Sequence, residues 1–171
     1  LSIRRQRQMC IRDSLRACLT KQMCFKTWHF FIILNRSEMI SLYVDGSCLE
    51  NQNVDLNTPA AWGLVVVSGD NGLGKGNGEI VEEIFGNVVT STTDENYLGA
   101  EVGSNNTAEL SGFAEALRWL LIEGSDTPAI IRTDSLYAGN LATGKWNPKT
   151  NKKIVESLQK LWKEVKTLRA V

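Results

Sequence analysis

Cysteine is scarce in this sequence and is not arranged as a framework. Four cysteines occur in 171 residues, and no two of them form a Cys-x-x-Cys pair. Only Cys48 lies in the part of the chain that has a clear hydrophobic pattern. The sequence therefore predicts neither disulfide bonds nor a zinc site, and it indicates a reducing, intracellular compartment rather than secretion.

Long hydrophobic runs are missing as well. The longest early apolar run extends from Trp28 to Leu34, which is far shorter than the roughly 20 residues that a membrane-spanning helix needs. It also lacks the small residues of a signal-peptide cleavage site. We therefore expect no membrane partner, and the sequence does not distinguish cytoplasm, nucleus and organelle.

The chain has no excess of charge of one sign, but its charges are unevenly spread. It contains 19 basic and 19 acidic side chains. Residues 41–140 hold 15 of the acidic side chains and three basic ones, whereas residues 141–171 hold eight basic and two acidic ones. An acidic centre beside a basic tail suits a cation site next to a phosphate-binding surface. Ordinary solvated charge explains the same composition equally well.

The first 38 residues look foreign to the rest of the chain. The sequence begins with Leu1, and the stretch QMCIRDS, Gln8 to Ser14, resembles a translated sequencing adaptor. Met39 directly precedes the first clear strand pattern and is the expected native start. We therefore expect residues 1–38 to be a non-native or disordered leader and residues 39–171 to form one domain. A genuine basic extension is the alternative.

The remaining sequence alternates between strand and helix patterns. Apolar, β-branched runs predict strands, and apolar residues at i, i+3 and i+4 predict helices. The long helix has Asn105 or Asn106 as its natural N-cap and ends at Gly124. The predicted elements, in chain order, are strands 41–47, 60–68 and 79–89, a helix from 105 to about 123, strand 128–135, and helices 136–143 and 152–167.

This order indicates an α/β fold with a mixed sheet. The first three strands would form an antiparallel meander, and the helical crossover would place the fourth strand parallel to the first. Leu168 to Val171 would begin a fifth strand that is cut short. The glycine-rich stretch 69–76 nearly matches a phosphate-binding loop, but it lacks the required Ser or Thr and the following helix, so we predict a hairpin turn there.

Two of the predicted strands end in an aspartate, Asp45 and Asp134. If these strands are parallel neighbours about 4.8 Å apart, both carboxylates lie at the carboxyl edge of the sheet. Glu109 lies at the border of the helix's apolar stripe and would join them. At about 4 Å and an effective dielectric constant near 20, each like-charged pair costs roughly 4 kcal/mol, so this site must hold a proton or a cation.

Oxygen ligands without Cys or His favour magnesium, with manganese as the second choice. Two such ions about 3.5–4 Å apart are the usual apparatus for hydrolysing a phosphodiester. Each carboxylate also has a purely structural explanation, because Asp45 and Asp134 are typical turn residues. Glu109 stands three residues after Asn106, which is the spacing of a capping box. All three explanations would have to hold at once, so we favour the metal site.

Three motifs carry a resemblance to a known family. YVDGSC, SNNTAEL and RTDSLYA, beginning at residues 43, 104 and 132, resemble the ribonuclease H family, type 1 branch. The resemblance implies a ribonuclease H-like mixed five-stranded sheet flanked by helices. It further implies an endonuclease that cleaves the RNA strand of RNA–DNA hybrids with two Mg²⁺ ions and leaves 5′-phosphate and 3′-hydroxyl ends. Asp45, Glu109 and Asp134 match its catalytic, metal-binding carboxylates.

The resemblance also implies contacts with the hybrid substrate. Asn105 and Asn106 match positions that contact the minor groove, where the 2′-hydroxyl groups of RNA are displayed. Gly46, Ser47 and Ser135 match residues that lie close to the substrate backbone. The expected partner is therefore an RNA–DNA hybrid, and we expect the protein to act as a monomer.

The sequence departs from the family on its C-terminal side. The family has a fourth carboxylate and a mobile histidine after a fifth strand, whereas the only histidine here, His29, lies in the leader. We therefore expect the domain to be incomplete at its C-terminus, and the chain as given to be impaired. The family's long basic handle is replaced by GKWNPKTNKK. Its lysines either touch phosphates beside Trp146 or are ordinary solvated side chains: Lys145, Lys149, Lys152 and Lys153.

Three other functions are compatible with parts of this sequence. A catalytically inactive interaction module would keep the fold, but it has no need for all three carboxylates. Transposase and integrase cores share the fold, yet their sites usually end in a late Glu, whereas Glu109 lies between the two aspartates. The ribonuclease H unit of a reverse transcriptase is the alternative that the sequence excludes least.

Overall fold

The computed structural model describes residues 39–49, 51–70, 77–122 and 127–171. The predicted leader and residues 71–76 of the predicted glycine-rich hairpin turn lie outside the described residues. Within the described ranges, the order of strands and helices is the one that the sequence predicts.

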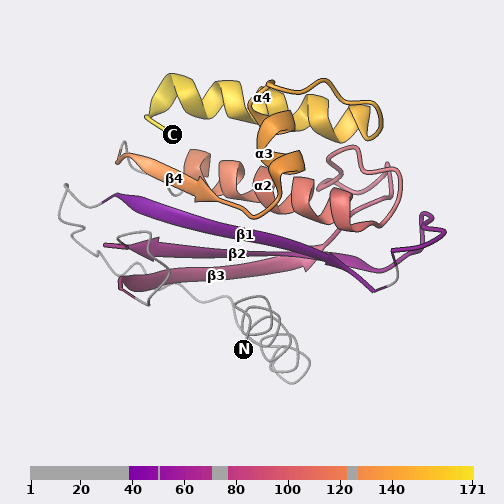
Figure 1. Cartoon of the computed structure of the whole chain (residues 1–171), viewed down its shortest axis with the longest axis horizontal. Helices are drawn as coiled ribbons and strands as arrows, with labels where there is room; N and C mark the ends of the chain where they lie inside the picture. The colour runs from indigo at the N-terminus through magenta and orange to yellow at the C-terminus, as the bar shows by residue number, and fades with distance from the viewer. Residues whose placement is uncertain (1–38, 50, 71–76, 123–126) are drawn as a thin grey trace. The chain divides into compact units, whose positions relative to one another are not determined.

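The described strands form one mixed sheet (Figure 1). The strands are β1 (Ile40–Cys48), β2 (Ala60–Ser68), β3 (Glu79–Asn87) and β4 (Ala129–Arg132). Their order in the sheet is β3-β2-β1-β4. The pairs β1–β2 and β2–β3 are antiparallel, whereas β4 runs parallel to β1. This arrangement confirms the predicted meander followed by a helical crossover.

Three helices stack on one another above the sheet in Figure 1. They are α2 (Asn105–Ile122), α3 (Leu136–Ala142) and α4 (Lys152–Leu168). The long helix α2 packs on β1 and β2, and α4 packs on α2. The short helix α3 contacts both α2 and α4. The sheet and α2 therefore form the frame on which the ends of β1 and β4 are held.

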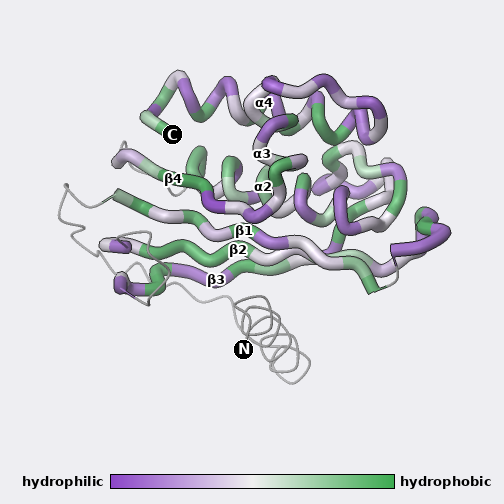
Figure 2. The backbone as a smooth tube through the Cα atoms, viewed as in Figure 1, coloured by the Kyte–Doolittle hydropathy of each residue, from purple (hydrophilic) through white to green (hydrophobic). Residues whose placement is uncertain are grey.

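Alternation along the strands builds the core beneath α2. Successive side chains of a strand point to opposite faces, and the buried apolar residues Ile40, Leu42 and Val44 of β1 are two apart, as are Leu64 and Val66 of β2. The apolar residues of these strands are green in Figure 2. On α2 the predicted apolar stripe is buried with the usual helical spacing. The largest fully buried side chains from these elements are Leu42, Leu64, Val66, Leu110, Leu117 and Leu120.

The predicted fifth strand is not present in the part of the chain that the structure describes. Helix α4 continues through Leu168, so only three residues follow it. One backbone hydrogen bond links this end of the chain to the sheet, from the amide of Ala129 to the carbonyl of Ala170 (3.1 Å). A strand requires a series of such bonds, and the sheet of the described residues therefore has four strands. The predicted fourth strand, 128–135, is also too long, because β4 ends at Arg132.

Candidate metal centre

The pairing of β1 with β4 brings Asp45 and Asp134 together. The parallel register ends at the pair Tyr43 and Arg132. Each aspartate lies two residues beyond that pair in its own chain segment. Asp45 is still within β1, whereas Asp134 lies in a bend just after β4. The end of the parallel pairing therefore brings both aspartates to the same edge of the sheet. The geometry thus follows from the register that the parallel sheet imposes.

Gly46 allows Glu109 to approach from α2. A Cβ atom at Gly46 would lie 2.3 Å from the backbone nitrogen of Glu109 and 2.8 Å from the Cβ of Ala108. Both distances are far below van der Waals contact, so any side chain at this position would push β1 and α2 apart. The absence of a side chain at Gly46 is therefore what lets the first turns of α2 lie against the end of β1.

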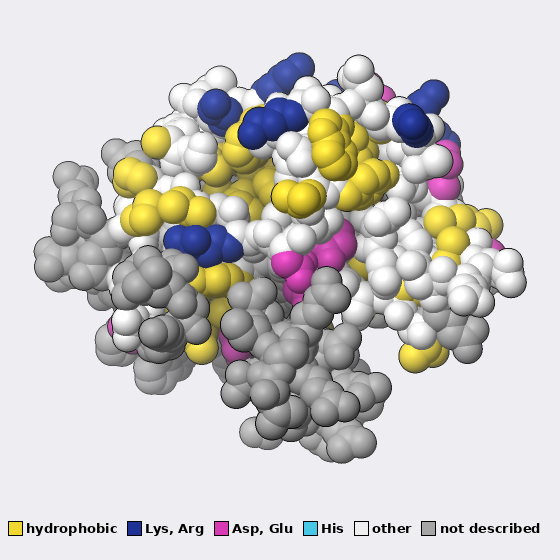
Figure 3. All heavy atoms as spheres, in the orientation of Figure 1, with side chains coloured by type: hydrophobic (Ala, Val, Ile, Leu, Met, Phe, Trp, Pro, Cys, Tyr) yellow, Lys and Arg dark blue, Asp and Glu magenta, His cyan; other side chains and the backbone are white. Residues whose placement is uncertain are grey.

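The three predicted carboxylates converge. Asp45, Glu109 and Asp134 each offer an oxygen atom, and these atoms lie within 4.8 Å of one another. Asp45 and Glu109 are half-buried, whereas Asp134 is exposed. In Figure 3, acidic side chains gather near the middle of the displayed face, and Lys and Arg side chains lie along the upper margin, over α4. The cluster is thus accessible from solvent on one side.

The environment of Glu109 disfavours its charged form. The pKa of Glu109 is raised from 4.5 to about 7, first by burial and then by the neighbouring charges of Asp45 and Asp134. Hydrogen bonds from the Gly46 amide and the Thr133 hydroxyl lower the pKa of this carboxyl by less. Oε2 of Glu109 is buried and has no hydrogen-bond partner within the described residues.

An unpaired buried carboxylate oxygen is costly unless a cation takes the place of the missing hydrogen bond. Asp45, Glu109 and Asp134 supply only oxygen atoms, the donor type that Mg²⁺ and Mn²⁺ prefer. The cluster therefore fits a divalent metal site, with Glu109 oriented by Gly46 and Thr133.

The helix cap differs from the prediction. Ser104, rather than Asn105 or Asn106, caps α2: its side-chain oxygen accepts a hydrogen bond from the amide of Thr107 (3.2 Å). The Thr107 hydroxyl in turn accepts one from the amide of Ser104 (2.8 Å). This reciprocal pair has the pattern of a capping box. The capping explanation for Glu109 is therefore wrong, and its carboxylate is available for another role.

The predicted substrate residues lie on three segments, each of which also carries one carboxylate of the cluster. Asn105 and Asn106 are exposed at the start of α2, and the Asn105 amide donates to Oδ1 of Asn51 (3.3 Å). Ser47 is exposed directly after the half-buried Gly46. Ser135 caps α3, because its hydroxyl accepts a hydrogen bond from the amide of Ala138 (3.1 Å).

The lysines that were considered as phosphate contacts differ in their surroundings. Lys153 forms an ion pair with Glu101 (3.0 Å), so its charge is already balanced. Lys145, Lys149 and Lys152 are exposed, and Trp146 is 49% exposed beside them. The exposure of these residues is compatible with phosphate contact and equally with ordinary solvated charge.

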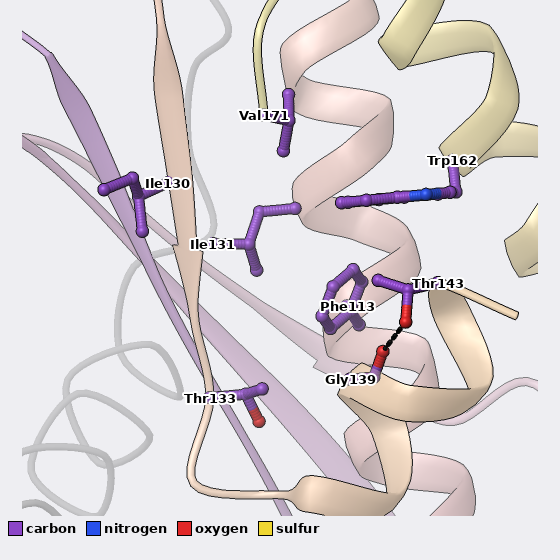
Figure 4. A pocket seen from close by; sticks show the side chains of 8 residues that line it. All are labelled: Phe113, Ile130, Ile131, Thr133, Gly139, Thr143, Trp162 and Val171. Atoms are coloured by element: carbon purple, nitrogen blue, oxygen red, sulfur yellow. Dashed lines mark hydrogen bonds between the residues drawn. The ribbon is translucent and has the colours of Figure 1, made fainter. Parts of the chain in front are cut away.

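Thr133 is a site residue that sequence reasoning missed. It lies between β4 and Asp134, and its hydroxyl accepts a hydrogen bond from the amide of Ser135 (3.0 Å) in addition to its contact with Glu109. Thr133 also lines an apolar pocket with Phe113, Ile131 and Trp162, whose side chains come from α2, β4 and α4 (Figure 4). Its position directly before an aspartate of the predicted cluster was the only signal in the sequence.

The fold and the cluster define an α/β protein in which three carboxylates gather at the ends of two parallel neighbouring strands and the first turns of α2. Residues 37–170 match the family model described as RNase H, and this chain belongs to that family. The predicted recognition is thereby confirmed. The family acts on RNA–DNA hybrids and uses divalent metal ions, and its members are hydrolases.

Solved structures provide the second comparison. LC11-RNase H1, isolated from compost by a metagenomic approach, is 23% identical, with a TM-score of 0.51 and 77% of this chain and 81% of the other covered. RNase H1 from the archaeon Halobacterium salinarum NRC-1 is 25% identical, with a TM-score of 0.47 and 76% of each chain covered. The protease–reverse transcriptase of prototype foamy virus is 14% identical, with a TM-score of 0.51, 78% of this chain covered and 17% of that one.

The two structures with a TM-score of 0.51 agree with an RNase H fold. No curated protein sequence matches this chain. None of the helices in the described ranges combines the length and apolar character that crossing a membrane requires.

Proposed function

We propose that this protein is an endonuclease that hydrolyses the RNA strand of RNA–DNA hybrids and leaves 5′-phosphate and 3′-hydroxyl ends. The observation that carries the proposal is the convergence of Asp45, Glu109 and Asp134 within 4.8 Å, in a chain that belongs to the RNase H family. Three acidic groups so close together are unfavourable unless they bind cations. We assign catalysis to this cluster.

Asp45, Glu109 and Asp134 would hold two divalent ions, Mg²⁺ in the first place and Mn²⁺ as the alternative. When bound, such a pair of ions supplies an activated water and stabilises the leaving oxygen of the phosphodiester. The protein's own contribution is positional. The parallel register sets the spacing of the two aspartates, and the close approach at Gly46 brings in Glu109. Exposure of Asp134 leaves the solvent side open to a phosphate.

The hybrid would bind across the segments that surround the carboxylates. We assign minor-groove contacts to Asn105 and Asn106, which are exposed on the first turn of α2. Amide side chains can both donate to and accept from a 2′-hydroxyl, the group that distinguishes RNA from DNA. Gly46, Ser47 and Ser135 would lie along the substrate backbone. The protein would do this as an intracellular monomer, with residues 39–171 as the nuclease domain.

A second function is favoured by one specific observation. The similarity to the foamy virus protease–reverse transcriptase has the same TM-score as the similarity to LC11-RNase H1. The domain is therefore equally compatible with the ribonuclease H unit of a reverse transcriptase. Both proposals assign the same reaction to the same residues, so the experiment below tests them together. An inactive interaction module is the outcome to be excluded.

The test uses the full protein that its gene encodes. An RNA–DNA hybrid with labelled RNA is incubated with Mg²⁺, and the fragments and their termini are analysed. We expect hybrid cleavage, none of the RNA duplex, and a loss of at least about 100-fold for Asp45→Asn, because a direct ligand should cost no less than the outer-sphere partners of a metal do.

The matched control is Asp94→Asn, which alters an exposed aspartate whose contacts are local to its own turn. It should cleave like the wild type. No cleavage of the hybrid by the wild type, or cleavage undiminished in Asp45→Asn, would refute the proposed function.

A further inference from the structure

A group of polar side chains outside the carboxylate cluster links three strands of the sheet. The hydroxyl of Tyr43 on β1 donates a hydrogen bond to Oδ2 of Asp70, which lies two residues after the end of β2. Nε of Arg132 on β4 lies 3.9 Å from the same carboxylate oxygen and 3.4 Å from the Ser41 hydroxyl, to which it donates. The Arg132 guanidinium carbon lies 5.8 Å from the centre of the Tyr43 ring.

This group, which we call the Tyr43–Asp70–Arg132 cluster, is largely buried. The side chain of Asp70 is only 5% exposed, and that of Arg132 is 30% exposed. A buried carboxylate is tolerated when a cation and hydrogen bonds compensate for its lost hydration. Asp70 has both, one from Arg132 and one from Tyr43. The cluster therefore joins β1 and β4 through a shared partner that belongs to neither strand.

The Tyr43–Asp70–Arg132 cluster lies next to the metal centre along both strands. Tyr43 and Arg132 are cross-strand partners and form the last pair of the parallel register. Asp45 and Asp134 follow two residues later in their own chain segments. Beyond this pair, no ladder hydrogen bonds hold the two chain segments together in the described residues. Whatever fixes the last pair therefore also sets the distance between the two aspartates.

We propose that the Tyr43–Asp70–Arg132 cluster is a positioning device that sets the spacing of Asp45 and Asp134 and thereby the affinity of the site for divalent metal. This inference rests on the proposed function for its metal site but does not need catalysis. The residues act through the strands and touch neither the ion nor the substrate. Outer-sphere groups that orient metal ligands typically change affinity by about 10- to 100-fold when removed.

The experiment measures binding of Mn²⁺ alone, by electron paramagnetic resonance of the free ion, to the protein used in the cleavage assay. Arg132→Met removes the cation and keeps a side chain of similar length, and we expect about 10-fold weaker binding. Arg132→Lys restores a charge that can pair with Asp70, so it should recover part of the loss. Tyr43→Phe keeps the ring and removes only the hydroxyl, which should give a smaller weakening without unfolding the protein.

Arg118→Met is the matched control. It removes a comparable ion pair, Arg118 with Glu115 at 2.8 Å, further along α2, and Mn²⁺ affinity should stay at the wild-type value. Thermal melting measured in parallel identifies variants that are unfolded at the titration temperature. If Arg132→Met is one of them, the Mn²⁺ affinity of Tyr43→Phe tests the proposal in its place.

The proposal is overturned if the folded variants among Arg132→Met and Tyr43→Phe bind Mn²⁺ like the wild type, if the control weakens binding equally, or if the wild type binds no Mn²⁺. Failure of the proposed function has a different signature. In that case the wild type binds Mn²⁺, the variants bind it more weakly, and no protein cleaves the hybrid.

Discussion

Glu109 is the side chain whose chemistry depends most on its surroundings. Its carboxyl is buried beside Asp45 and Asp134, and its pKa is raised to about 7. A glutamate on a solvated helix surface would be ionised well below that pH. The folded protein without metal therefore prefers to keep a proton on Glu109, and binding of a cation displaces that proton.

The raised pKa predicts how stability changes with pH in the metal-free protein. Because the folded-state pKa of Glu109 lies above the unfolded value, the folded state binds the proton more tightly. The stabilisation from this proton is complete below about pH 4.5 and is lost as pH rises through about 7. We expect the melting temperature of the wild type, relative to Glu109→Gln, to fall between these pH values when measured with chelator present.

Glu156→Gln is the control for that experiment, since Glu156 is an exposed partner of Lys160 on α4. The melting temperature of Glu156→Gln should change with pH in the same way as that of the wild type over this range. A wild-type protein that gained stability relative to Glu109→Gln as pH rose toward 7 would contradict the assignment of the proton to Glu109.

The contact between β1 and α2 shows how two elements create the site. It depends on Gly46, where a Cβ would lie 2.3 Å from the helix backbone. Ser104 and Thr107 fix where the helix begins, and the buried stripe of α2 fixes how it lies on the sheet. Helix start, helix rotation and strand approach must agree for Glu109 to reach the aspartates.

Gly46→Ala should therefore damage the metal centre through the backbone. The added methyl group has to separate β1 from α2, and overpacking of this kind typically costs about 1–3 kcal/mol. We expect a lower melting temperature and weaker Mn²⁺ binding, measured by thermal denaturation and metal titration.

Gly139→Ala is the matched control for Gly46→Ala. A Cβ at Gly139 would meet only the Thr133 side chain at 3.8 Å, an ordinary contact, and Gly139 lies within α3. Alanine is favoured over glycine inside a helix by about 0.5–1 kcal/mol, so this variant should be at least as stable as the wild type. If Gly46→Ala matched the wild type in stability and in metal affinity, the space between β1 and α2 would have to accommodate a Cβ atom, and the prediction would be wrong.

The local sequence predicted the elements better than their ends. Apolar periodicity was sufficient for the order of strands and helices, because burial imposes that periodicity on any chain of this fold. The predicted N-cap of α2 was wrong because three consecutive residues, Ser104, Asn105 and Asn106, are all of types that cap helices well. The reciprocal hydrogen bonds between Ser104 and Thr107 select Ser104.

Considered as a whole, the protein holds three acidic groups together in its folded state. Bringing Asp45, Glu109 and Asp134 within 4.8 Å is a cost that the unfolded chain does not bear. The core beneath α2 and the sheet register offset that cost. Bound cations would remove it, which makes folding and metal binding thermodynamically linked.

This linkage predicts opposite effects of one substitution with and without metal. In chelator, Asp45→Asn should melt at a higher temperature than the wild type, because it removes one of the repelling charges. Saturating Mg²⁺ should raise the wild-type melting temperature, by about 2.7 kcal/mol of stability when the free ion is 100 times its dissociation constant, and should raise that of Asp45→Asn far less. Identical shifts in both proteins, recorded by differential scanning calorimetry, would argue against a metal site at these carboxylates.

Local pattern in the amino-acid sequence was enough to establish the strand and helix order, the three carboxylates and the family motifs, because each of these is written in consecutive or periodically spaced residues. Packing in three dimensions established the rest: the short β4, the raised pKa of Glu109 and the Tyr43–Asp70–Arg132 cluster. Each of these depends on distances between residues that are far apart in the chain, such as Asp70 and Arg132. No local pattern encodes such distances, because they exist only once the sheet register and the helix position are set together.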